Sequence, residues 1–264
     1  MAILHSAPLT AIPEYFTVTS AAAPDTYRES GFIPSPGRVY FGTAPDGSPC
    51  LVTTVAEGDP LDQVGAYRSE VAAPQVSANT GYWITWESFL PTDFPYNAVP
   101  DFFNQGTYCI AQMHDSPDVG NPIVNLSNVV FFVNNAGHII VKVPTLASFA
   151  DKTSESNYDV YIGPKLKLGQ WVKMAWLVKF TTDATGFIES YYDGVPVCKV
   201  WRQRTDYTNL LAPYLRLGVY DFHHLDGFGR MTQYVRNVVI RDGSDSAFSA
   251  MGMDRIAAAP KQIP

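Results

Sequence analysis

Hydrophobic and polar residues alternate along several short stretches of the chain, which is the pattern of β-strands with one buried face. In the segment 171–181 the apolar positions recur at every second residue, with Leu177 as the exception: Val172, Met174, Trp176, Val178 and Phe180. A period of two predicts a strand that is half buried against a core, because successive side chains of a strand point to opposite faces.

Turn residues between alternating segments predict hairpins. The segments 187–192 and 195–200 flank Asp193-Gly194, a dipeptide that supplies the positive φ angles of a two-residue turn. The segments 129–133 and 138–143 flank a four-residue turn that ends at Gly137, and they predict a second hairpin. Further strands are expected at 82–90, 109–114, 214–220 and 234–241, and one short helix is expected at 246–259.

Many short strands with few helices favour a sandwich or a barrel. Aromatic residues make up 13% of the 264 residues and charged residues only 16%, a mixture that suits two curved antiparallel sheets packed face to face. We therefore expect an all-β jelly-roll sandwich with few short helices. A single domain is expected over 1–264, with its core at about 31–243 and docked N- and C-terminal extensions. Most of the 35 aromatic residues should fill the core, while Tyr, Trp and His on a concave sheet would suit sugar rings.

Charge and cysteine content narrow the classes of partner. With 18 Lys+Arg against 25 Asp+Glu the net charge is −7, which argues against a general nucleic-acid binder. No stretch approaches the ~20 apolar residues that cross a bilayer, so no membrane partner is expected. The cysteines Cys50, Cys109 and Cys198 show no CxxC spacing and are expected to be buried small hydrophobic residues.

The first 25 residues do not predict a Sec signal peptide. They carry no positive n-region, and Pro8 and Pro13 interrupt any apolar h-region. We therefore expect extracellular action by another route, such as association with a virion, or a cytoplasmic location.

Polar side chains interrupt three of the expected strands on one face each. They are Arg68 and Glu70 in the first strand, Gln112 and His114 in the second, and Arg216, Gly218 and Tyr220 in the third. By the same alternation, the opposite face of the second strand is expected to carry Cys109, Ala111 and Met113. In the third strand, Gly218 has no side chain and is expected to leave room for a ligand between Arg216 and Tyr220. Exposed sheets also carry polar residues without function, so the pattern alone leaves both interpretations open.

An ordered series of segments carries a resemblance to a known family. It comprises YRSEV at 67–71, YWITWESFLP at 82–91, IAQMHDSPD at 110–118, GQWVKMAWLVKF at 169–180, YYDGVPV at 191–197 and YLRLGVY at 214–220. The series resembles the heparin lyase I-like and glucuronan lyase-like polysaccharide lyases, which have a concanavalin A-like β-jelly roll with a concave substrate groove. The resemblance implies that Arg68, Gln112, His114 and Tyr220 line that groove, and that Arg216 stands where the family usually has Lys.

The chemistry that the resemblance implies is β-elimination at a uronic acid of an acidic polysaccharide. Arg68 or Arg216, with Gln112, would neutralise the carboxylate and stabilise the charge that develops beside it. His114, with an ordinary pKa near ~6.5, can accept the C5 proton. Tyr220 can protonate the leaving O4, or act as the base if neighbouring Arg lowers its pKa. This scheme requires no metal, and although some relatives carry a structural Ca²⁺, no Asp-rich ligand loop is visible here.

Four further residues are expected to contact substrate from strand ends and loops: Arg202, Arg204, His223 and His224. Adjacent histidines seldom chelate one metal, so we do not expect zinc at the last two. Two other functions stay open. Glu87 and Glu189 could serve a glycoside hydrolase, and the same scaffold could be a non-catalytic carbohydrate-binding or structural module that packs against other subunits of a bacteriophage particle.

Overall fold

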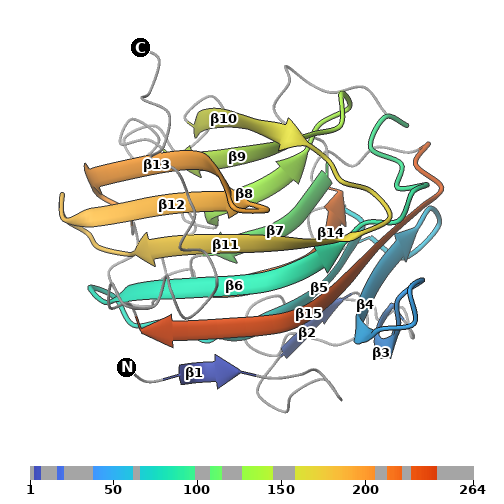
Figure 1. Ribbon diagram of the computed structural model, residues 1–264, viewed down its shortest axis with the longest axis horizontal. Coiled ribbons are helices and arrows are strands. Elements are labelled where there is room, and N and C mark those ends of the chain that lie inside the picture. The colour runs from blue at the N-terminus through green and yellow to red at the C-terminus, as the bar shows by residue number, and fades with distance from the viewer. Residues whose placement is uncertain are drawn as a thin grey trace.

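The computed structural model describes residues 3–6, 17–20, 38–61, 66–98, 108–114, 127–144, 158–205, 213–221 and 227–242. Every element in these segments is a β-strand, and the strands form two antiparallel sheets, one in front of the other in Figure 1. Because no described segment is helical, none of them provides a helix that could span a membrane.

The front sheet has eight strands. In spatial order it contains β13 (Val195–Gln203), β12 (Gly186–Tyr192), β11 (Trp171–Lys179), β6 (Gly81–Phe89), β15 (Arg230–Asp242), β4 (Pro49–Ala56) and β3 (Val39–Thr43), and β1 (Ile3–Ser6) pairs with β15.

The second sheet has seven strands. In spatial order it contains β10 (Tyr158–Lys165), β9 (His138–Pro144), β8 (Ser127–Val133), β7 (Tyr108–His114), β14 (Tyr214–Asp221), β5 (Arg68–Gln75) and β2 (Thr17–Ser20). Strands that are neighbours in this sheet, such as β7 and β14, are far apart in the sequence.

The structure confirms the all-β sandwich and both predicted hairpins. The β12–β13 turn has φ angles of 50° at Asp193 and 77° at Gly194, as a two-residue turn with both central residues left-handed requires. The predicted helix at 246–259 lies outside the described residues, and the extent of a single domain over the whole chain stays a prediction.

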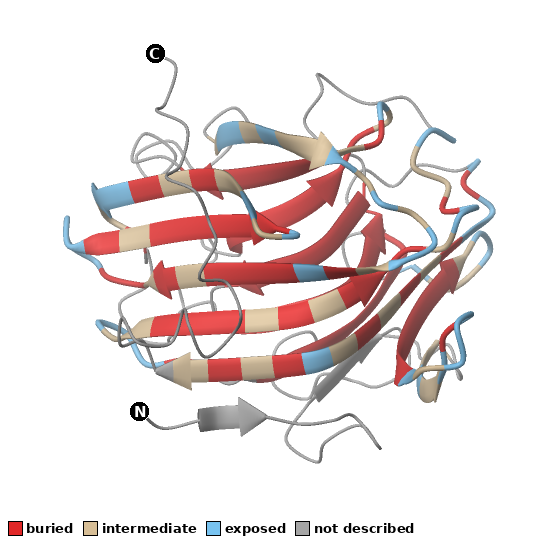
Figure 2. Ribbon diagram, viewed as in Figure 1, coloured by how far each residue is buried: buried red, intermediate tan, exposed pale blue. Residues whose placement is uncertain are grey.

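Aromatic packing joins the two sheets. Trp86 of β6 and Trp176 of β11 meet edge to face with ring centroids 4.9 Å apart, and Phe131 of β8 stacks on Trp176 at 5.1 Å. These rings belong to a core of alternating inward residues from both sheets, and Figure 2 shows the buried stretches of the described strands in red. Burial of the apolar surface of these core residues supplies the hydrophobic stabilisation that holds the two sheets together.

A bulge in β7 changes one predicted face. The register of β7 against β8 shifts between Cys109 and Ala111, so Ala111 and Met113 still point into the core with Ile110. Cys109 instead joins a smaller cluster with Tyr220 and residues of β8 and β9. The prediction that Cys109 shares a face with Ala111 and Met113 is therefore wrong, because one extra residue in a strand reverses the alternation behind it.

Candidate active site

Three neighbouring strands bring the predicted site residues together on the seven-stranded sheet. In the pairing of β14 with β5, Tyr220 lies opposite Arg68 and Gly218 lies opposite Glu70. In the pairing of β14 with β7, Arg216 lies opposite Gln112 and Tyr214 lies opposite His114. We call this set the Glu70 cluster: Arg68, Glu70, Gln112, His114, Tyr214, Arg216 and Tyr220.

Glu70 is the centre of the cluster and is fully buried. Gln112 Nε2 donates a hydrogen bond of 2.8 Å to Glu70 Oε1. Arg68 Nε and Arg216 Nη1 each lie 3.5 Å from Glu70 Oε2, close enough for ion pairs. A buried carboxylate is therefore stabilised by two positive charges and one amide, as a charge in a low-dielectric site requires.

The groups around Glu70 are themselves held in place. Ser127 Oγ on β8 donates to Gln112 Oε1 at 2.6 Å, which fixes the orientation of the amide. Arg216 donates to the Tyr214 hydroxyl from Nε at 3.1 Å and from Nη2 at 2.6 Å. The Arg68 guanidinium lies over the ring of Tyr220, 4.1 Å from its centroid, in a cation–π contact.

The two predicted proton-transfer groups lie at opposite ends of the cluster. His114 is next to Tyr214, with ring centroids 5.7 Å apart, whereas Tyr220 is six residues further along β14. Six residues of extended strand correspond to about 20 Å. The backbone of the cluster is therefore longer than a single reaction centre, with a phenol at each end and both guanidinium groups against Glu70 between them.

The cluster is buried in this structure. The exposed fraction is 1% at Arg216, 2% at Gln112, 5% at Tyr220 and 6% at Arg68 and His114. The low exposed fractions do not confirm the open groove that the sequence predicts over these residues. Burial also raises the pKa of the Cys109 thiol beside the cluster, and the charge of Glu70 raises it further.

Gly218 has a different role from the predicted one. Its φ is +147°, and a Cβ at this position would lie 2.1 Å from the carbonyl oxygen of Ser69 and 2.6 Å from Cα of Glu70. Glycine is thus required because the β5 backbone approaches β14 closely, and the prediction that it leaves room for a ligand is wrong.

A family model described as polysaccharide lyase matches residues 38–238, which include the whole Glu70 cluster and the strands of both sheets except β1, β2 and the end of β15. The chain belongs to the polysaccharide lyase family. The prediction of a polysaccharide lyase is confirmed. A comparison with curated protein sequences gives no match.

Solved structures show the same jelly-roll fold as this polysaccharide lyase. An endo-β-1,4-glucuronan lyase from the fungus Trichoderma reesei has 15% sequence identity, with 92% of each chain covered and a TM-score of 0.56. The alginate lyase AlyC3 also has 15% identity, with 76% of this chain and 77% of that chain covered and a TM-score of 0.53. The family 7 alginate lyase A1-II' has 14% identity, coverage of 80% and 85%, and a TM-score of 0.51. At these identities the likeness shows the fold alone.

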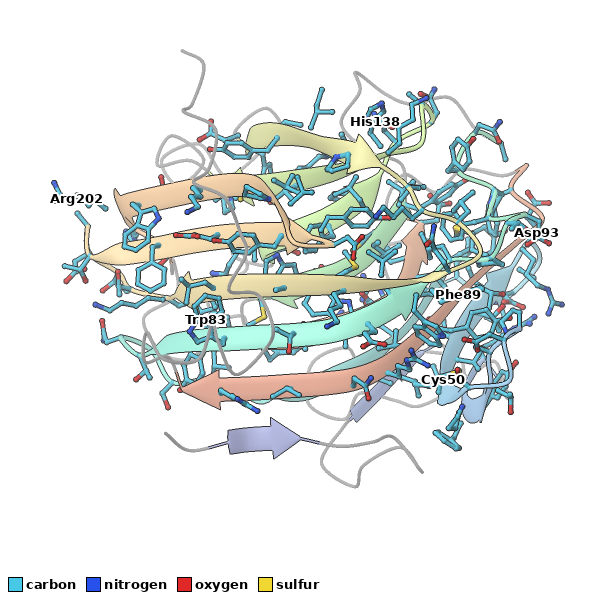
Figure 3. The ribbon with its side chains drawn as sticks, in the orientation of Figure 1. Cys50, Trp83, Phe89, Asp93, His138 and Arg202 are labelled. Carbon is cyan, nitrogen blue, oxygen red and sulfur yellow. The ribbon has the colours of Figure 1, made fainter. Side chains whose placement is uncertain are left out.

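The predicted substrate contacts from strand ends are not all near the cluster. Arg202 is exposed at the end of β13 on the other sheet of the lyase, as Figure 3 shows. Arg204 follows β13 and precedes Thr205. The carbonyl oxygen of Thr205 accepts a hydrogen bond of 2.8 Å from Asn128 Nδ2 on β8. His223 and His224 lie outside the described residues.

The geometry disfavours the hydrolase alternative. Glu87 lies opposite Lys173 and Glu189 lies opposite Leu177, on the two strands that flank β11. Four residues of strand and two strand spacings place their backbones roughly 16 Å apart, whereas glycosidase carboxyl groups are about 5–9.5 Å apart. Each is also already paired, Glu87 with Arg236 at 2.7 Å and Glu189 with Lys199 at 3.2 Å.

Sequence reasoning placed Glu70 beside Arg68 but gave it no role in the site, and it missed Tyr214 of the cluster and Ser127, which orients Gln112. Tyr214 shares the alternation of Arg216 and Tyr220 and could have been found from it. Ser127 gave no signal, because its contact with Gln112 depends on the pairing of β7 with β8. Among the described residues, no three His, Cys, Asp or Glu side chains come together as a metal site, and the cofactor expectations stay predictions.

Proposed function

We propose that this lyase cleaves a uronic-acid-containing polysaccharide by β-elimination at the Glu70 cluster. The observation that carries the proposal is that two guanidinium groups, one amide, one imidazole and two phenols lie on one face of three adjacent strands. The solved structures that share the fold are named as a glucuronan lyase and an alginate lyase. Both names refer to uronic-acid polymers, which supports this substrate class.

The reaction needs three actions, and the cluster contains a group for each. Arg68 or Arg216, with Gln112, binds the carboxylate at C6 and stabilises the negative charge that grows as the C5 proton leaves. A neutral His114 or an ionised Tyr220 takes that proton, and the bond from C4 to O4 breaks as the C4–C5 double bond forms. A phenol or imidazolium then protonates O4.

The separation of His114 from Tyr220 indicates that one end of the cluster performs both proton transfers. At one end His114 is accompanied by Tyr214 and Arg216, and at the other Tyr220 is accompanied by Arg68. The stereochemistry at C5 of the polymer decides which end is used. Substrate also has to displace whatever covers these buried side chains before either end can act.

The test is a panel of glucuronan, alginate and glycosaminoglycans, with ultraviolet absorbance of the unsaturated uronate as the readout. We expect one polymer to give product, and the rate to fall about 10²–10⁴-fold in His114→Ala or in Tyr220→Phe, according to which end acts. Tyr214→Phe separates the two ends, because it should lower the rate only if the His114 end is used.

His138→Ala is the matched control, since this histidine is the first residue of β9 and contacts the Gly163 carbonyl instead of the cluster. Absence of product with every polymer, or full activity in both the His114→Ala and Tyr220→Phe variants, would contradict the proposal. The second hypothesis, a non-catalytic module of a bacteriophage particle, stays a prediction; it would give polymer binding without product.

A further inference from the structure

A large aromatic side chain is exposed on the outer face of the eight-stranded sheet, far from the Glu70 cluster. Trp201 of β13 is 56% exposed, whereas Trp83, Trp86 and Trp176 are at most 2% exposed. The ring of Phe187 on β12 stacks against it, with centroids 4.8 Å apart and an interplanar angle of 22°. Phe187, which is itself half-buried, covers one face of the indole, and the exposed remainder of the indole is a flat apolar surface of the kind that sugar rings cover with their C–H faces.

The indole of Trp201 is held in one orientation by a buried acid. Its Nε1 donates a hydrogen bond of 2.9 Å to Oε1 of Glu189, which is almost fully buried. The Tyr191 hydroxyl donates to the same carboxylate, and burial raises the pKa of Tyr191 so that the donor keeps its proton. Lys199 Nζ lies 3.2 Å from Glu189 Oε2. The ring is therefore fixed before any ligand arrives, which lowers the entropy cost of binding.

Positive charges border the two rings. Lys179 of β11 lies opposite Phe187, which lies opposite Trp201, so one row crosses three strands. Arg202 follows Trp201 at a bulge with φ of 59°, and Figure 3 shows its side chain at the end of β13. Besides the buried Glu189, one exposed acidic group is near: the pKa of Asp183 is lowered mainly by hydrogen bonds from Thr185, with a smaller effect of Lys179.

We propose that Trp201 and Phe187 form a second carbohydrate-binding site, separate from the Glu70 cluster, that holds one sugar ring of an acidic polysaccharide. The ring stacks on the indole, and Lys179 and Arg202 contact its carboxylate. The site performs no chemistry; it keeps a long polymer on the enzyme. The identity of the polymer rests on the proposed function, but the presence of the site does not.

The unmodified protein gives a direct readout. All five tryptophans lie in the described segments. Trp201 is exposed, Trp171 is half-buried and the other three are buried, so Trp201 is the tryptophan most accessible to acrylamide. We expect oligosaccharides of glucuronan or alginate to reduce the quenching of wild type by acrylamide. Trp201→Phe should leave only the weaker quenching of the half-buried Trp171 and abolish the effect of the oligosaccharides. Quenching that no oligosaccharide of either polymer changes would overturn the proposal.

A binding measurement tests the same site through variants. In native gels that contain the polymer, Trp201→Ala should raise the apparent Kd about tenfold, the size expected when a stacking surface is lost. The matched control is Tyr40→Ala, because Tyr40 is 44% exposed on β3 at the opposite edge of the same sheet and should leave retention unchanged. Lys179→Ala with Arg202→Ala leaves the rings intact and should also weaken retention.

Cleavage by the same proteins separates the two proposals. If wild type gives no unsaturated product but Trp201→Ala still loses retention, only the proposed function fails. If Trp201→Ala is retained like wild type, the second site is refuted whether or not the enzyme cleaves the polymer.

Discussion

Replacement of Glu70 by Gln tests whether one buried charge organises the candidate active site. The substitution keeps size and shape but removes the negative charge that Arg68 and Arg216 both face at 3.5 Å. The side chains of both arginines are at most 5% exposed, so water cannot replace the lost carboxylate.

The expected cost follows from distance and burial. At 3.5 Å and an effective dielectric constant of about 20, each ion pair contributes roughly 5 kcal/mol of Coulomb attraction, most of which offsets desolvation. Removal of one partner of a buried pair costs about 3–5 kcal/mol, and we expect this decrease in the free energy of unfolding. For a chain of this size the decrease corresponds to roughly 6–20 °C in Tm.

Glu87→Gln is the matched control. Glu87 pairs with Arg236 at the shorter distance of 2.7 Å, but the two side chains are 18% and 27% exposed. Because solvent screens such a pair, the same substitution should cost at most about 1 kcal/mol. Burial and not distance should therefore decide which variant is less stable.

Urea unfolding followed by tryptophan fluorescence measures both variants, with similar m-values expected. Glu70→Asp keeps the charge and should lose less stability than Glu70→Gln. A Glu70→Gln variant that is no less stable than Glu87→Gln would refute the view that Glu70 holds the two guanidinium groups.

Two further predictions concern backbone and thiols. Gly218→Ala should lower the free energy of unfolding by at least about 3 kcal/mol, because the new Cβ would collide with the β5 backbone. Gly194 also has a positive φ, of 77°, but a Cβ there would have nothing within 4 Å, so Gly194→Ala should lower it by about 1–2 kcal/mol. Equal losses in urea unfolding would contradict the close approach of β5 to Gly218. Burial raises the pKa of Cys50 to about 11 and of Cys198 to about 12, so the folded state holds these protons more tightly than the unfolded state. The stability they contribute is complete below the unfolded pKa of 9.0 and should fall by roughly 1.4 kcal/mol per pH unit for each thiol as pH rises from 9 toward 11. Cys198→Ala should reduce this slope, and rapid reaction of native Cys198 with a thiol reagent at pH 8 would refute the assignment.

Strands and hairpins could be predicted because their signals are local. The alternation in 171–181 became β11, and Asp193-Gly194 became the β12–β13 turn, since a period of two and a positive φ depend only on neighbouring residues. The β7 bulge could not be predicted, because it depends on the register of β7 against β8. It placed Cys109 on the face opposite to the expected one.

For the candidate site, the sequence determined which residues share a strand face: Arg68 with Glu70, Gln112 with His114, and Arg216 with Tyr220. Only the tertiary structure decided that β5, β14 and β7 are neighbours, that Glu70 lies between two arginines, and that His114 and Tyr220 lie at opposite ends. It also placed Trp201 and Arg202 on the other sheet. The physical reason is that alternation follows from chain geometry within a few residues, whereas strand order and register are set by packing between segments more than a hundred residues apart.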